Sequence, residues 1–148
     1  MSPEFQSYCL PTETEWDYAA RAGATTAYPW GEALGVNQAN CLNDYCKDEF
    51  AFTAPVASFA PNVFGLHDMQ GNVWEWTQDC LASYKEPSGV MARLYRYLPN
   101  CQNWEQPDLN GLYVIRGGAW SDVRLLSSSR GGYTKDRRMT DVGFRVAQ

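Results

Sequence analysis

The sequence is short of the residues on which many metal centres and membrane spans depend. It holds one histidine, His67, although imidazole is the commonest metal ligand among the side chains. A zinc site is disfavoured because this histidine lies far in sequence from any pair of cysteines. No run reaches 18 apolar residues, so we expect no membrane-spanning segment. No cysteine follows Cys101, which leaves the last third of the chain without a thiolate.

The chain contains enough apolar material for one folded domain. Its 148 residues, 45% apolar and 20% charged, have the size and composition of a single globular unit. We assign the domain to residues 9–148, with residues 81–110 as a proline-containing insertion. Residues 1–8 are expected to be a junction-like or disordered start. They show no signal peptide, so the sequence does not indicate a compartment.

Charge is distributed unevenly along the chain. Residues 116–148 carry seven basic and three acidic side chains, whereas the remainder carries five basic and 14 acidic ones. A basic end can bind nucleic acid, but these arginines are interleaved with Gly, Ser and Asp rather than clustered. Pairing with acidic neighbours and backbone carbonyls is the favoured interpretation, and we expect no nucleic-acid partner.

The five cysteines suggest crosslinks rather than a metal site. Cys41 and Cys46 are closely spaced, and Cys80 and Cys101 flank the insertion. This spacing suits two local disulfides with Cys9 as an odd thiol, and plain buried thiols remain an alternative.

One helix is predicted near the start of the chain. Thr12-Glu13-Thr14-Glu15 is a capping box, and Trp16, Ala19 and Ala20 then fall on one helical face. Gly23 is a stop signal.

Most of the remaining chain is predicted to be loop. Residues 24–60 lack a period and are expected to pack onto the core through Tyr28, Trp30, Phe50 and Phe52. Strands are predicted over residues 73–77, 112–116 and 143–147. The expected fold is α+β, with few regular elements and a small antiparallel sheet.

Two fixed-looking blocks enclose a polar segment near the C-terminus. Arg116-Gly117-Gly118-Ala119-Trp120 and Val142-Gly143-Phe144-Arg145-Val146 flank residues 121–141, which have almost no hydrophobic period. A rigid frame around a polar, glycine-containing insert is typical of a surface that recognises a ligand.

Four blocks of sequence carry a family resemblance. They cover residues 10–21, residues 54–56 with 62–66, Gly-Asn-Val-Trp-Glu-Trp at 71–76, and Arg-Gly-Gly-Ala-Trp at 116–120 with Gly-Phe-Arg at 143–145. The chain resembles the formylglycine-generating enzyme (sulfatase-modifying factor) family, whose domain is a variant of the C-type lectin fold. The resemblance implies that fold over nearly the whole chain.

The resemblance also implies two structural calcium sites. The first set is Asn40, the backbone of Cys41, Asp48 and the backbone of Phe50. The second set is Asp68, the backbones of Gly71 and Val73, and Glu75. Such mixtures of carboxylate and carbonyl oxygens suit Ca²⁺. The alternative is that Asp68 and Glu75 only cap a turn through hydrogen bonds to backbone amides.

The catalytic chemistry of the family is where this sequence departs. The family's oxidases hold copper through two cysteines after the Gly-Gly block, and soft thiolates are what Cu(I) requires. Here Ser121 and Asp122 follow the block, and no thiol is present there. A related branch binds iron through histidines, which this chain lacks apart from His67. We therefore expect no copper and disfavour the known enzyme activities, with an oxidase or degenerate relative as the alternative.

The same frame resembles the variable proteins of diversity-generating retroelements, in which this segment is rewritten to bind new targets. We accordingly predict a non-catalytic module that recognises a protein or cell-surface ligand. The predicted ligand-binding residues are Ser121, Asp122, Val123, Arg124, Leu126, Ser129, Gly131, Gly132, Tyr133, Arg138, Met139, Thr140 and Asp141.

A purely structural role, with Arg130 and Arg145 inside the core network, is the alternative. Sugar binding would rest only on Gln106-Pro107-Asp108, a short match.

Overall fold

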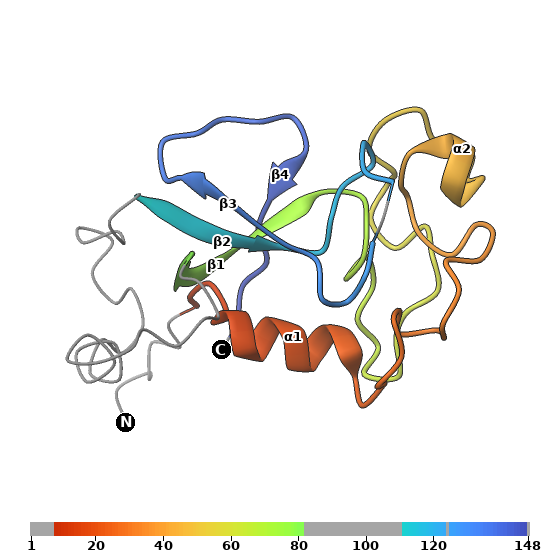
Figure 1. Ribbon diagram of the computed structural model, residues 1–148, viewed down its shortest axis with the longest axis horizontal. Coiled ribbons are helices and arrows are strands. Elements are labelled where there is room, and N and C mark those ends of the chain that lie inside the picture. The colour runs from red at the N-terminus through yellow and green to blue at the C-terminus, as the bar shows by residue number, and fades with distance from the viewer. Residues whose placement is uncertain (1–7, 82–110, 124, 148) are drawn as a thin grey trace, which may run out of the picture.

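The computed structural model describes residues 8–81, 111–123 and 125–147 (Figure 1). A sheet of four strands, in the order β3-β2-β1-β4, lies above helix α1 in the view of Figure 1. The loops between α1 and β1 extend to one side of the sheet and carry the short helix α2. Among the described residues no helix is long or apolar enough to cross a membrane.

Helix α1 spans Glu13–Arg21 and begins as its sequence predicts. Thr12 is the N-cap, and its hydroxyl accepts a hydrogen bond from the backbone N–H of Glu15 at 3.2 Å. The Glu15 carboxylate accepts bonds from Thr12 in return, which lowers the pKa of Glu15. Trp16 and Ala20 are buried, and the helix packs against β1 and β2. The prediction of this helix is confirmed.

The two central strands lie close to their predicted positions, whereas the two edge strands do not. Strand β1 spans Trp74–Cys80 and β2 spans Leu112–Arg116, and they pair antiparallel. Strand β3, Arg130–Thr134, pairs antiparallel with β2 inside the segment expected to be irregular. Strand β4 contains only Val142–Gly143 and runs parallel to β1.

The strand predicted over residues 143–147 is therefore wrong beyond Gly143, where the chain leaves the sheet. Farther along, Ala147 pairs with Cys9 in an isolated bridge outside the sheet.

The long loop between α1 and β1 is packed by aromatic rings, as expected. Tyr28 is buried and stacks on Trp30 with ring centres 5.3 Å apart, and Phe50 meets Phe59 edge-on at 6.1 Å. Phe52 differs from the expectation because it is 67% exposed. Helix α2, Asn43–Cys46, is a single turn in this loop.

The Cys41–Cys46 disulfide is present and lies in a buried cluster with Tyr28, Ala39 and Leu125. Cys80 also takes part in a disulfide, and its partner lies outside the described residues. Cys9 is a free, exposed thiol. Of the predicted insertion 81–110, only Leu81 lies within the described residues.

Candidate functional site

The first block of the C-terminal frame is bound to the turn before β1 by backbone hydrogen bonds. Gly71 N–H donates to the Gly117 carbonyl at 3.0 Å, and Trp120 N–H donates to the Asn72 carbonyl at 2.9 Å. Gly117 has φ +97°, and a Cβ there would come within 3.1 Å of the Met69 carbonyl and 3.2 Å of the Trp16 ring. Only glycine accommodates this conformation without strain.

The second block is held by a buried carboxylate. Arg145 donates two hydrogen bonds of 2.6 Å to Glu75, one to each carboxylate oxygen. Trp16 Nε1 donates a third to Glu75 at 2.6 Å, and Glu75 is 5% exposed. Such a bidentate pair fixes both position and orientation. We call residues 116–120 and 142–145 the framework.

Two further arginines fasten the framework to helix α1. Arg116 is 2% exposed, donates to Asp17 and to the carbonyls of Ser127 and Ser129, and stacks over Trp16 at 5.2 Å. Arg130 donates to both carboxylate oxygens of Glu13, at 2.7 and 2.8 Å. Arg130 and Arg145 thus lie in structural ion pairs, as expected if these two arginines belong to the core network.

The predicted ligand-binding residues divide into three groups by position. Exposed side chains belong to Ser121, Val123, Arg138 and Thr140. Partly buried ones belong to Asp122, Leu126, Ser129, Gly131, Gly132, Tyr133, Met139 and Asp141. Arg124 lies outside the described residues.

Several of the partly buried residues make structural contacts. Gly131 and Gly132 lie in β3 opposite Ile115 and Val114, and a Cβ on Gly131 would meet the Ile115 side chain at 3.1 Å. The Asp122 carboxylate accepts a bond from Ala119 N–H at 2.8 Å and so closes the turn after the first block.

A hydrogen bond joins the first and last residues of segment 121–141. Ser121 Oγ donates to the Asp141 carboxylate at 3.3 Å, which joins the turn at 121–123 to the end of the β3–β4 connection. That connection, together with Thr134 at the end of β3, covers residues 134–141 and arches away from α1 in Figure 1. We call residues 134–141 the display loop.

The display loop is largely exposed and carries more positive than negative charge. Lys135, Asp136 and Arg137 are exposed together with Arg138. A hydrogen bond from the Thr134 hydroxyl and one from its own backbone N–H lower the pKa of Asp136. Residues 134–137 were not among the predicted contacts. The polar Thr-Lys-Asp-Arg run after two glycines is the signal that could have identified them.

Two buried polar atoms near this surface lack partners among the described residues. They are Trp120 Nε1, a donor, and Asp141 Oδ1, an acceptor. Trp120 also meets the exposed ring of Phe52 edge-on at 5.1 Å. Buried polar atoms are rarely left unpaired, so Trp120 Nε1 can donate a hydrogen bond to an ordered water and Asp141 Oδ1 can accept one.

The first predicted calcium set fits a cation. Asn40 is fully buried, and its Nδ2 donates to the Phe52 carbonyl at 2.9 Å, while its Oδ1 has no partner among the described residues. The Asp48 carboxylate is buried and accepts bonds from the N–H groups of Cys41 and Phe50. A buried carboxylate and an unpaired amide oxygen that flank the Cys41–Cys46 disulfide loop suit Ca²⁺.

The second predicted calcium set does not fit in this arrangement. Both carboxylate oxygens of Glu75 are bound by Arg145, which supplies the positive charge that a metal would otherwise supply. Asp68 accepts a bond from Ala57 N–H at 2.8 Å, so it caps a backbone turn. Gly71 and Val73 lie between these two residues in the turn before β1.

A second carboxylate, that of Asp79, lies next to the ion pair between Arg130 and Glu13. Asp79 lies on β1, and its carboxylate accepts a hydrogen bond from Glu13 N–H. Burial raises the pKa of Asp79, although that hydrogen bond acts in the opposite direction.

Comparison with known proteins identifies close relatives along the whole chain. The family described as sulfatase-modifying factor enzyme 1-like domain matches residues 2–148. The mouse protein named inactive C-alpha-formylglycine-generating enzyme 2 is 35% identical over 153 residues, covering 93% of this chain and 42% of that protein. Mouse formylglycine-generating enzyme is 44% identical over 153 residues, covering 93% and 38%. The chain thus spans less than half the length of these curated relatives.

Two solved structures share the architecture. PvdO from Pseudomonas aeruginosa superimposes with a TM-score of 0.71 at 31% identity, over 94% of this chain and 51% of that one. Treponema denticola variable protein 1 gives a TM-score of 0.64 at 24% identity, over 94% and 46%. At 24% identity, the similarity to variable protein 1 shows only that the two proteins share a fold. Together they confirm the α+β fold class predicted from the sequence.

Proposed function

Because the chain belongs to the family of the sulfatase-modifying factor enzyme 1-like domain, we propose that it is a non-catalytic ligand-binding module of that family. The observation that carries the proposal is the contrast within residues 116–147. The framework is bound into the core through Arg116 and Arg145, and the adjacent strand β3 is bound through Arg130, while the display loop projects charged side chains into solvent. A rigid base with a polar, exposed loop is the arrangement that recognition surfaces use.

The sequence of the segment supports the non-catalytic part of the proposal. No cysteine occurs after Cys101, so no thiolate is available there to hold copper as in the family's oxidases. Ser121 and Asp122 follow the first block instead, and both are engaged in local hydrogen bonds. A relative at 35% identity is itself named inactive.

The surface chemistry indicates what kind of ligand would bind. Lys135, Arg137 and Arg138 favour a protein or cell-surface partner with acidic groups, because opposite charges speed and orient encounter. Met139 and the Phe52–Trp120 pair add apolar and aromatic contact area at the side of the loop.

Binding can be tested with a library because no ligand is identified. We would pan a random peptide phage library against the full chain and deplete it on a Lys135→Glu/Arg137→Glu/Arg138→Glu variant. The expected clones are acidic, bind the unchanged chain, and lose affinity as salt is raised. Recovery of no clone after depletion, or of clones that are neither acidic nor sensitive to salt, would contradict a role for the display loop.

We also propose that the segment is diversified by a retroelement, as the shared frame of the variable proteins suggests. This proposal predicts a second, nearly identical copy of the coding segment in the source genome, differing at adenines. Sequencing of the region downstream tests it, and the absence of such a copy would end it.

A formylglycine-generating oxidase is the competing function, and the 44% identity to mouse formylglycine-generating enzyme favours it. The chain would be incubated with Cu(I), oxygen and a peptide carrying a sulfatase cysteine motif. Mass spectrometry of the peptide is expected to show no conversion. Metal-dependent turnover would refute the non-catalytic proposal.

We further propose one structural calcium ion, held by Asn40, Asp48 and the backbone carbonyls of Cys41 and Phe50. The unpaired Oδ1 of buried Asn40 supports it. The ion would brace the loop that receives the C-terminal frame, because Leu42 N–H donates to the Asp122 carbonyl at 2.9 Å.

A further inference from the structure

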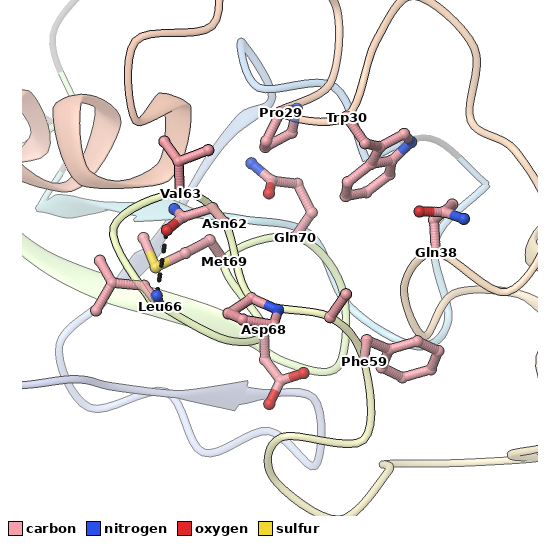
Figure 2. Close-up of a pocket in the computed structure, with 12 residues that line it drawn as sticks. Pro29, Trp30, Gln38, Phe59, Asn62, Val63, Leu66, Asp68, Met69 and Gln70 are labelled. Carbon is pink, nitrogen blue, oxygen red and sulfur yellow. Dashed lines mark hydrogen bonds between the residues drawn. The ribbon is translucent and has the colours of Figure 1, made fainter.

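A cavity lies away from the display loop, between the turn at Pro29 and Trp30 and the loop of residues 59–70 (Figure 2). Its volume is about 210 Å³. Cavities of roughly 150 Å³ hold benzene, and drug-sized ligands occupy about 300–1,000 Å³. The space therefore suits a single ring with short substituents.

The walls of the cavity are apolar and held in place. Trp30 Nε1 donates to the carbonyls of Ala33 and Leu34, at 3.1 and 3.0 Å, and its ring stacks on Tyr28. On the opposite wall Asn62 uses its amide to bind the Ala19 carbonyl at 2.7 Å and accepts a bond from Leu66 N–H at 3.1 Å (Figure 2). A site whose walls are already ordered loses little entropy when a ligand enters.

Gln70 is the one wall residue whose buried polar group is unpaired. It is 5% exposed, and its Nε2 has no hydrogen-bond partner among the described residues. Figure 2 shows its carboxamide on the same side of the cavity as Pro29 and Trp30. A buried N–H group without an acceptor is unfavourable, so an oxygen or nitrogen acceptor, from an ordered water or from a ligand, would satisfy it.

Asp68 gives the other end of the cavity a negative charge. It lines the cavity, and its carboxylate points away from the Gln70 carboxamide in Figure 2. It is partly buried, and one oxygen already accepts a bond from Ala57 N–H. A carboxylate at this end attracts a cation and repels a second anion.

We propose that this cavity binds a small aromatic molecule that carries a carbonyl at one end and a cationic amine at the other. The ring lies among Trp30, Phe59 and Met69, the carbonyl accepts from Gln70 Nε2, and the amine faces Asp68. The site is separate from the display loop, so either proposal can fail without the other.

The test uses the isotope-labelled full chain and the probe 4-(aminomethyl)benzamide, followed by NMR. Saturable shifts are expected at the Gln70 side-chain amide and the Trp30 indole, with a dissociation constant on the order of a millimolar. Benzamide, which lacks the amine, should bind about two- to fivefold more weakly. 4-Carbamoylbenzoate should bind more weakly still. Shifts confined to residues 121–141, or none at Gln70 and Trp30, would overturn the proposal.

Two variants separate the site from general effects on folding. Gln70→Met removes the unpaired donor, so the probe should bind about three- to tenfold more weakly while the melting temperature does not fall. Gln38→Met makes the same change at an exposed lining residue and should alter affinity less than about twofold. Ala60→Trp, at the exposed rim, should block the probe. Equal affinity in the Gln70 and Gln38 variants would refute the role of Gln70.

Discussion

The framework and the display loop come from one basic stretch of chain, yet their arginines have opposite environments. Arg116 is 2% exposed and bound to Asp17 and two carbonyls. Arg138 is exposed, and its guanidinium donates to the backbone carbonyls of Lys135 and Arg137 at 3.5 and 3.3 Å. A buried guanidinium must be paired, whereas an exposed one is solvated by water. The same residue type therefore contributes to stability in one region and lies in solvent in the other.

Removal of a framework arginine should have the largest effect. Arg116→Met leaves the carbonyls of Ser127 and Ser129 without their side-chain donor and removes one of two cationic partners from Asp17, so the expected loss of unfolding free energy is about 3–5 kcal/mol. The matched change Arg138→Met should cost less than about 0.5 kcal/mol. Urea unfolding of both variants measures the difference. Equal losses would remove the distinction between the two regions.

Calcium should stabilise the loop that braces the framework. At about 100 times its dissociation constant the ion would add roughly 2.7 kcal/mol to the unfolding free energy. Asp48→Asn should abolish the calcium-dependent rise in melting temperature, whereas Asp44→Asn, at an exposed position nearby, should retain it. A melting temperature of the unchanged chain that is the same with calcium and with a chelator would contradict the proposed site.

A methyl group at Gly117 should disturb the framework. Gly117→Ala combines an unfavourable φ of +97° with a Cβ 3.1 Å from the Met69 carbonyl, and we expect a loss of about 2 kcal/mol. Gly23→Ala is a useful control, because φ there is +90° but no atom lies within 4 Å of the added Cβ. The excess loss at Gly117, measured by thermal unfolding, reports the close packing alone.

The display loop should tolerate added length. Insertion of two glycines after Asp136 lengthens an exposed connection whose closure entropy changes slowly, and the expected loss is below about 0.6 kcal/mol. Peptide binding selected on the unchanged loop should nevertheless weaken. A loss of several kcal/mol on thermal unfolding would show that the loop is part of the framework.

The smallest expected effect concerns Asp79. Burial raises its pKa in the folded chain, so its ionisation disfavours the folded state, and that penalty appears as pH rises through the folded pKa. Asp79→Asn keeps an oxygen acceptor for Glu13 N–H and should raise stability slightly at neutral pH. The gain should vanish in acid, where Asp79 is protonated. Unfolding curves across pH test this, and a gain that grows toward low pH would contradict it.

Sequence reasoning succeeded where the pattern is local. The capping box at Thr12, the run Leu112–Arg116 and the short Cys41–Cys46 spacing each specify structure through near neighbours, and all three are present as predicted. Strand β3 could not be found in this way, because Gly131 and Gly132 have low strand propensity. They form a strand because β2 offers a free edge and the Ile115 side chain fills the space above Gly131.

Some features of the candidate site could likewise be predicted from the sequence, and others could not. Its frame and its polar segment are visible in the sequence, since Arg-Gly-Gly-Ala-Trp and Gly-Phe-Arg are specific strings. Which arginines point inward is not visible, because their carboxylate partners, Glu13, Asp17 and Glu75, lie 70 or more residues away in the chain. The cavity around Gln70 is likewise built from segments with no shared pattern.

By itself the amino-acid sequence determined the family, the α+β class, the first helix, the central strands and the lack of thiolates after Cys101, because each depends on local residue identity. The tertiary structure alone decided that Arg116, Arg130 and Arg145 are structural, that residues 130–134 join the sheet, and that the exposed surface is the loop 134–141. Burial and charge pairing are properties of the folded arrangement, and distant segments must come together before they exist.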